Sequence, residues 1–139
     1  MSQPPVKITR KVDKRDGYAC VRCGISLTVT SGSRHHRQRR RDGGHTTSNL
    51  ILLCGSGTTG CHGWAHAHPT NAHAAGYIVP ATGRATPEVI PVLVYWPGAE
   101  PFQSHVWVIL DGDGNRHTIP DAEAQELLVA FGLITLEVA

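Results

Sequence analysis

The residues best suited to chemistry are cysteines and histidines that gather in one window, residues 20–66. All four cysteines of the 139-residue chain and five of its nine histidines lie there. Thiolate and imidazole groups are preferred ligands of zinc and of other first-row divalent metals. The window therefore predicts two kinds of metal site, one built from cysteines and one from histidines.

The cysteines fall into two pairs. Cys20 and Cys23 are spaced C-x2-C, which lets one turn of chain present two thiolates to one tetrahedral ion. Cys54 and Cys61 have the wider spacing C-x6-C, and the segment between them, Gly-Ser-Gly-Thr-Thr-Gly, is flexible. We predict that all four bind one structural Zn²⁺. The alternatives are unrelated free cysteines and disulfides, and disulfides lack a secretory context here.

The histidines form a second set. His35 and His36 are adjacent, so on an extended strand they point to opposite faces. His62 and His66 are four residues apart, so on a helix they share a face and can bind one ion together. A neutral imidazole near pH 7 can also act as a general base. Metal ligands combined with a separate base suit phosphodiester hydrolysis.

In this order the residues resemble an HNH (ββα-metal) endonuclease, especially the small zinc-containing HNH proteins of bacteriophages. The resemblance covers roughly residues 10–80. His35-His36 matches the first H, Asn49 matches the N, and the segment from Cys61 to His66 carries the last H. Many family members have Asp-His or Glu-His at the first position, and the His-His found here resembles the colicin DNase arrangement.

The resemblance implies a role for each matched residue. His36 is the general base, because the second residue of the pair has that role in the family. His35, His62 and His66 hold one catalytic divalent ion, Mg²⁺, Mn²⁺, Ni²⁺ or Zn²⁺. Asn49 pins the loop of the hairpin through backbone hydrogen bonds and so keeps the base in place. Spacing alone leaves open which of His35 and His36 is base and which is ligand.

Charge is distributed unevenly along the chain. Residues 1–45 hold 11 Lys and Arg against 3 Asp, whereas residues 46–139 hold 2 Arg against 8 acidic residues. A basic half beside a metal motif indicates a DNA-binding face, although such runs are also typical of a solvated segment or a mobile loop. The arginines expected to contact phosphates are Arg34, Arg37, Arg39, Arg40 and Arg41.

Local signals predict the elements that carry these residues. The turn signal at residues 31–33 places His35-His36 at the start of a strand. Residues 50–53 form a short buried apolar run. Residues 60–67 predict a helix, and a second short helix follows over residues 70–75.

We predict an α+β fold in two parts. Residues 1–87 form a ββα-metal HNH core stapled by the structural zinc, beginning with a basic helix or strand over residues 6–16. Residues 88–139 form a small appendage, a β-hairpin that turns at residues 111–115 followed by a helix over residues 120–131. The appendage carries no catalytic pattern, so it covers the core or binds a partner protein.

The predicted function is a metal-dependent DNA endonuclease that uses one catalytic ion and a histidine-activated water. Family context points to a phage origin and to terminase or other packaging proteins as partners besides DNA. The alternative is a non-catalytic zinc-ribbon DNA-binding module, which leaves the four motif histidines without a purpose. The chain shows no targeting or membrane-spanning segment, so we expect the cytoplasm, of the host if a phage encodes the protein.

Overall fold

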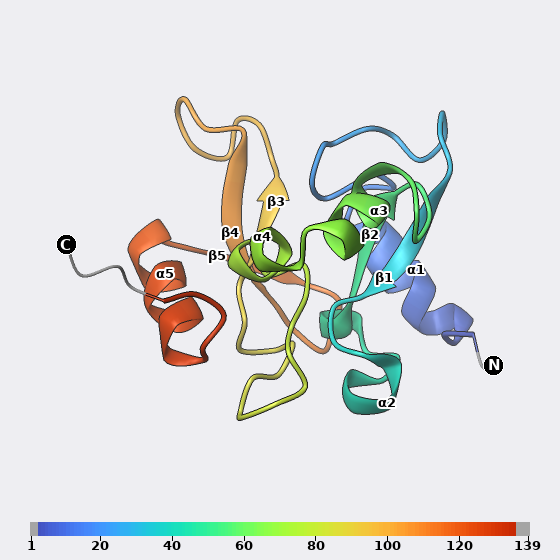
Figure 1. The fold of residues 1–139 in the computed structure, drawn as a ribbon. Coiled ribbons are helices and arrows are strands. Elements are labelled where there is room, and N and C mark those ends of the chain that lie inside the picture. The colour runs from blue at the N-terminus through green and yellow to red at the C-terminus, as the bar shows by residue number, and fades with distance from the viewer. Residues whose placement is uncertain (1–2, 136–139) are drawn as a thin grey trace.

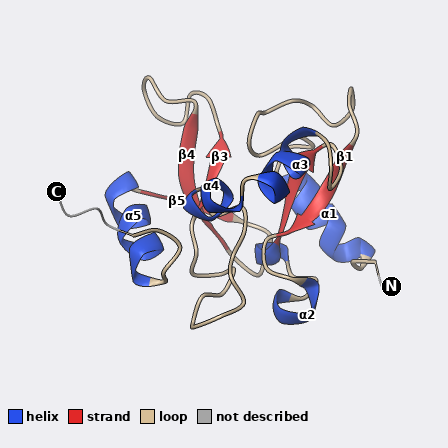
Figure 2. Ribbon diagram, viewed as in Figure 1, coloured by secondary structure: helices blue, strands red, loops and turns tan. Residues whose placement is uncertain are grey.

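The computed structural model describes residues 3–135 and combines helices with two antiparallel sheets (Figures 1 and 2). The helices are α1 (Val6–Arg15), α2 (Arg40–Gly43), the 3-10 helix η1 (Thr47–Asn49), α3 (Gly60–Ala67), α4 (Pro69–Ala74) and α5 (Asp121–Ala130). The strands are β1 (Gly32–His36), β2 (Leu50–Cys54), β3 (Val92–Tyr95), β4 (His105–Leu110) and β5 (Arg116–Ile119). The predicted α+β class is confirmed. None of the helices within residues 3–135 has the length and apolar character needed to span a bilayer.

Strand β2 is buried on both faces. Leu50 and Leu52 pack against Val12 of α1, while Ile51 and Leu53 belong to the larger core that includes residues of α3. Because neighbouring side chains of a strand point to opposite faces, helices on both sides require a continuous apolar run rather than an alternating one. This explains the run Leu50–Leu53 and fixes β2 as the central element between α1 and α3.

Strand β1 begins earlier than predicted, at Gly32, and His35-His36 lie at its end. Gly32 pairs with Cys54 in the antiparallel β1–β2 register. A side chain at Gly32 would clash with Leu27, since a Cβ there would lie 2.6 Å from it. The expectation that the two histidines open a strand is therefore wrong: the glycine that suggested a turn is the first residue of β1.

The predicted helices are present. The segment over residues 6–16, left open as helix or strand, is the helix α1. The helix predicted over residues 60–67 has those bounds, and the next one begins at Pro69, where proline is favoured as a first helical residue. The hairpin and helix expected near the C-terminus are β4–β5 and α5.

The hydrophobic core crosses the boundary predicted after residue 87. Val92 and Val108, from β3 and β4, lie in the same cluster as Ile51 of β2. The backbone N–H of Tyr95 donates to the carbonyl of Val21 at 2.6 Å. In Figure 1 the hairpin β1–β2 with α1 to α3 lies beside β3–β5 with α5. Residues 88–135 thus share the core of the preceding residues.

Arg37, which follows β1, lies in the interior with 1% of its surface exposed. Its guanidinium donates to the carbonyl oxygens of Gly76 (2.8 Å), Ser48 (3.0 Å), Pro87 (2.9 Å) and Ile90 (2.7 Å). The prediction that Arg37 contacts phosphate is wrong, because its donors are already used by buried carbonyl groups. Arg37 instead ties the end of β1 to the segment before β3.

Replacing Arg37 with Met removes these hydrogen bonds and keeps an unbranched side chain. We expect the free energy of unfolding to fall by about 3 kcal/mol or more, because each buried carbonyl that loses its donor costs about 1–3 kcal/mol. Urea unfolding followed by circular dichroism measures the change. The control is Arg39→Met at an exposed site, with an expected change below about 0.5 kcal/mol. Equal stability of the two variants would contradict the structural role of Arg37.

Candidate metal centres

The four cysteine sulfurs converge between the loop after α1, the end of β2 and the first turn of α3. Their Sγ atoms all lie within 4.8 Å of one another, and Cys23 Sγ is 3.8 Å from Cys54 Sγ. A tetrahedral zinc with Zn–S bonds of about 2.3 Å places its sulfurs about 3.8 Å apart. All four cysteines are free of disulfides. The donor set therefore fits a metal ion such as zinc.

Burial affects the thiols of this cluster. It raises the pKa of Cys61 and of Cys23. It also acts to raise the pKa of Cys20, but hydrogen bonds with the backbone of neighbouring cysteines outweigh it and leave that pKa lowered. Thiols that resist ionisation form a group of thiolates only beside a positive charge. A bound cation would therefore favour the thiolate forms of Cys23 and Cys61.

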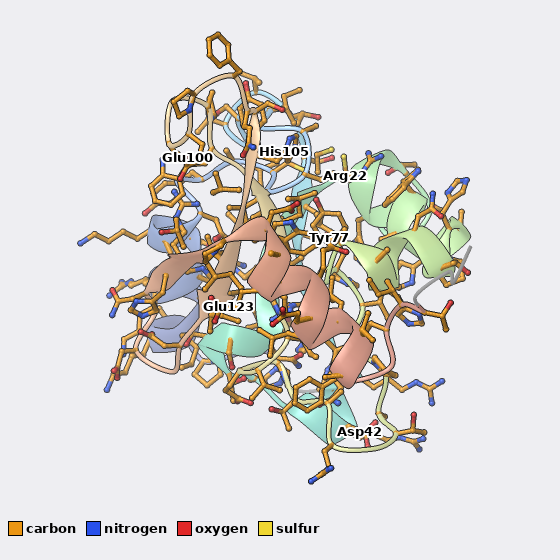
Figure 3. The ribbon with its side chains drawn as sticks, turned by 90° about the vertical axis from the view of Figure 1, so that its left-hand side faces the viewer. Arg22, Asp42, Tyr77, Glu100, His105 and Glu123 are labelled. Carbon is orange, nitrogen blue, oxygen red and sulfur yellow. The ribbon has the colours of Figure 1, made fainter. Side chains whose placement is uncertain are left out.

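Arg22 supplies one positive charge beside the cluster. Its guanidinium Nη1 donates to Cys61 Sγ at 3.4 Å, and the guanidinium carbon lies 3.6 Å from the centre of the Trp64 ring. The backbone of Arg22 is fixed from β4, where His105 Nε2 donates to the Arg22 carbonyl at 2.6 Å (Figure 3). Arg22 is thus positioned to offset part of the negative charge of a thiolate–metal group.

The second donor set joins the end of β1 to α3. His35, His62 and His66 bring one ring nitrogen each to within 4.8 Å of the others, and the Nε2 atoms of His62 and His66 are 3.0 Å apart. The ring centroid of His35 lies 4.9 Å from that of His62 and 5.5 Å from that of His66. The three residues predicted from the sequence as ligands of one ion are therefore brought together.

Hydrogen bonds determine which ring nitrogen of His35 and of His62 has the lone pair that can bind a metal ion. The carbonyl oxygen of Tyr77 accepts from His35 Nε2 at 2.8 Å, so the lone pair of His35 is on Nδ1. The hydroxyl of Ser33 donates to the Gly55 carbonyl at 2.9 Å, so it accepts from His62 Nδ1 at 2.6 Å. His62 consequently has its lone pair on Nε2, the atom that faces His66.

Burial favours the neutral form of His35 and of His62. The pKa of His35 is lowered to about 3, mainly by burial and in addition by the neighbouring histidines. Burial and His66 also lower the pKa of His62. Neutral imidazole is the form that binds a metal ion, so His35 and His62 can bind one at neutral pH without first losing a proton.

His36 points to the other face of the hairpin. His35 is paired with Ile51 and His36 with Leu50, which are on opposite faces of β2. The Nε2 atom of His36 lies 3.0 Å from Nδ1 of His45. Burial lowers the pKa of His36, and the nearby His45 and Arg40 lower it further. His36 is therefore a neutral imidazole, separate from the three-histidine set.

All four motif histidines line one cleft of about 1080 Å³. Ser33, which orients His62, lies on the same wall. No protein-family model, curated protein or solved structure matches the chain. What the protein does has to follow from the side chains of this cleft and of the cysteine cluster.

The remaining predicted arginines differ from Arg37 in their exposure. All five predicted arginines contribute to the lining of the cleft, but Arg37 is buried, whereas Arg34, Arg39 and Arg41 are exposed. Arg34 donates through Nε and Nη2 to the carboxylate of Asp13 at 2.9 and 2.6 Å, and its side chain is 42% exposed. The carboxylate of Asp13, in α1, thus offsets part of the positive charge of Arg34.

Asn49 is fully buried and connects both ends of the loop between β1 and β2. Its Nδ2 donates to the carbonyls of Gln38 and Gly44, each at 2.9 Å, and its Oδ1 accepts from the Gln38 N–H at 2.7 Å. Gly43 leaves room for this amide, since a Cβ there would lie 2.6 Å from Asn49 Nδ2. The side chain fixes the course of the loop that carries His45.

The structure adds two residues, Ser33 and His45, to those predicted for this region. Ser33 lies two residues before His35, so strand alternation places both on one face, and this signal was available. His45 lies in a loop outside the matched motif positions. Its contact with His36 depends on the path of that loop, for which the sequence gives no local signal.

We expect purified protein to contain one tightly bound zinc per chain at the cysteine cluster, measured by elemental analysis. Cys23→Ser should lose this zinc and unfold at a lower temperature, because metal binding in small domains is coupled to folding. His66→Ala, which changes an exposed residue of the other donor set, is the matched control and should keep both zinc and melting temperature. A stable, zinc-free wild-type protein would contradict the prediction.

Proposed function

We propose that the protein is a metal-dependent DNA endonuclease of the HNH type. The observation that carries the proposal is the cleft in which a neutral His36 lies next to, but outside, the donor set His35, His62 and His66. The order of elements supports it, since an antiparallel strand pair, β1–β2, is followed by α3 packed against it. That is the ββα order expected from the resemblance.

The three-histidine set suits one catalytic divalent ion. Three imidazole nitrogens leave coordination positions open, which distinguishes a catalytic site from a closed structural one such as the four-cysteine cluster. A bound ion supplies Lewis-acid stabilisation of the negative charge that develops on the phosphate and on the leaving oxygen. Mg²⁺, Mn²⁺, Ni²⁺ and Zn²⁺ are the candidates.

His36 and Asn49 have separate roles in the proposed reaction. His36 accepts a proton from water while the water oxygen bonds to phosphorus and the bond to the 3′ oxygen breaks. Its neutral state at pH 7 is the state that accepts a proton. Asn49 holds the loop beside His36 and so limits the movement of the base.

DNA binding is assigned to the basic rim of the cleft. Arg39, Arg40 and Arg41 follow the end of β1 and supply charge for phosphate oxygens. Gln3 and Pro4 place the start of α1 on the same cleft, and Lys7 and other basic residues of that helix are exposed. Such contacts give affinity for any sequence and weaken as salt rises.

The cellular setting proposed for this enzyme is a reducing cytoplasm, where thiolates bind zinc instead of forming disulfides. The resemblance to small phage HNH proteins supports a phage origin. It also supports a role beside terminase or other DNA-packaging proteins, which would be met in the cytoplasm of the host.

His36→Ala should lose about 10²–10⁴-fold in the rate of plasmid cleavage at saturating metal, because a general base contributes that much. It should keep the affinity for the catalytic ion. His62→Ala should instead weaken metal binding, and excess metal should restore part of its activity. Calorimetric metal titration and cleavage with Mg²⁺, Mn²⁺, Ni²⁺ or Zn²⁺, with and without EDTA, measure both effects.

His68→Ala is the control for these variants. His68 is exposed and stacks on Trp64 without lining the cleft, so this variant should match the wild type. If His36→Ala lost the metal while His35→Ala kept it, the two roles would be exchanged. If the wild type cleaved no DNA with any of the four metals, the non-catalytic zinc-ribbon module would replace the nuclease proposal.

Changing Arg39, Arg40 and Arg41 together to Ala should weaken binding to every DNA sequence to a similar extent. The slope of log K against log salt should flatten by about 0.9 for each phosphate that the variant no longer neutralises. Fluorescence anisotropy at several salt concentrations measures this. Arg84→Ala, at an exposed arginine that does not line the cleft, should keep the wild-type slope. An unchanged slope in the triple variant would contradict this prediction and would show that residues 39–41 are a solvated segment that does not contact phosphates.

A further inference from the structure

His45 makes a specific contact with the proposed base. Its Nδ1 lies 3.0 Å from Nε2 of His36, and the two ring centroids are 5.1 Å apart. Of these two residues, only His36 lines the cleft. His45 thus contacts the base without being among the residues that line the cleft.

The loop holds His45 in this place. Asn49 Nδ2 donates to the carbonyl of Gly44, the residue directly before His45, at 2.9 Å. The N–H of Gly44 donates to the carbonyl of Arg40 at 2.8 Å and closes α2. His45 itself is half-buried. The contact with His36 is therefore built on a fixed backbone.

The chemistry of this contact determines which atom of His36 can act. A neutral imidazole has one N–H and one lone pair, and a hydrogen bond at one nitrogen selects the tautomer. If His36 Nε2–H donates to Nδ1 of His45, the lone pair of His36 is on Nδ1. A base whose lone pair is on the nitrogen already bonded to His45 could not take a proton from water.

We propose that His45 is a positioning residue for His36, which accepts the Nε2–H hydrogen bond and keeps the reactive lone pair of His36 on Nδ1. The proposal rests on the proposed endonuclease function. In the reaction, His36 Nδ1 takes the proton that leaves the attacking water, and His36 becomes an imidazolium while its Nε2–H bond to His45 persists. His45 exchanges no proton with substrate.

The test compares two substitutions of similar size. In His45→Asn, Oδ1 occupies the place of the histidine Nδ1 and can accept the same hydrogen bond, whereas His45→Leu puts a methyl group there. Loss of the outer hydrogen-bond partner of a metal-ligating histidine typically costs about 10–100-fold in metal affinity or activity, and we take the same range for the partner of the base. We expect His45→Leu to lower kcat by about that factor, with KM and metal affinity within about 2-fold of the wild type. His45→Asn should stay within about 3-fold.

A role limited to folding would lower the activity of both variants in parallel with their melting temperatures. A kcat in His45→Leu equal to that of the wild type would overturn the proposal, as would an equal loss of kcat in the Asn and Leu variants.

A second measurement needs neither a variant nor cleavage. Nitrogen-15 chemical shifts of the wild-type protein at neutral pH distinguish the two tautomers of His36. The Nε2–H tautomer supports the proposal and the Nδ1–H tautomer overturns it. Because no DNA is present, this result is separate from the outcome of the plasmid assay, which alone decides the endonuclease proposal.

Discussion

The arrangement of both centres depends on the start of α3, where Cys61 and His62 are neighbours. Adjacent residues of a helix point about 100° apart, so one turn presents a sulfur to the cysteine cluster and an imidazole to the cleft. The cluster joins this turn to Cys54 at the end of β2. Whatever fixes the four sulfurs therefore also sets the rotation of α3, and with it the position of His62 and His66 opposite His35.

Two buried polar side chains, Arg37 and Asn49, hold the chain that follows β1 in place. Arg37 binds four carbonyl oxygens from segments far apart in sequence, and Asn49 binds both ends of the loop before β2. Buried polar groups that are fully hydrogen-bonded specify one arrangement, because any other leaves them unpaired at a cost. The cleft thus has rigid support beneath it, while its arginine rim remains open to solvent.

Features that depend on neighbouring residues, such as helix ends and the spacing of metal donors, could be predicted from the sequence. The family resemblance and Pro69 place α3, and Pro69 with Gly76 places α4 to within one residue. The pairing of His62 with His66 follows from their spacing on α3. The burial of Arg37 is not predictable in this way, because an arginine within a basic run looks like a surface residue until distant carbonyl groups are known to surround it. The contact of His45 with His36 is not predictable for a similar reason, because it depends on the path of the loop that Asn49 holds in place. The start of β1 at Gly32 is not predictable either. The sequence does not distinguish a glycine that leaves space for a neighbouring side chain, here Leu27, from a glycine in a turn.

If the protein is the endonuclease we propose, the geometry of β1 also limits the side from which its substrate can approach. His35 and His36 point to opposite faces of the hairpin, so neither face presents the base and the donor set together. Within residues 3–135, β1 pairs only with β2, which leaves its other edge unpaired. Both histidines line the same cleft. The endonuclease proposal therefore requires the phosphate group to bind at that edge, with His36 on one side and the three-histidine set on the other. An edge strand is normally a liability that invites pairing with another chain. Arg39, Arg40 and Arg41, which follow β1, line the cleft. In the proposed function, their positive charge favours DNA at this edge over another strand.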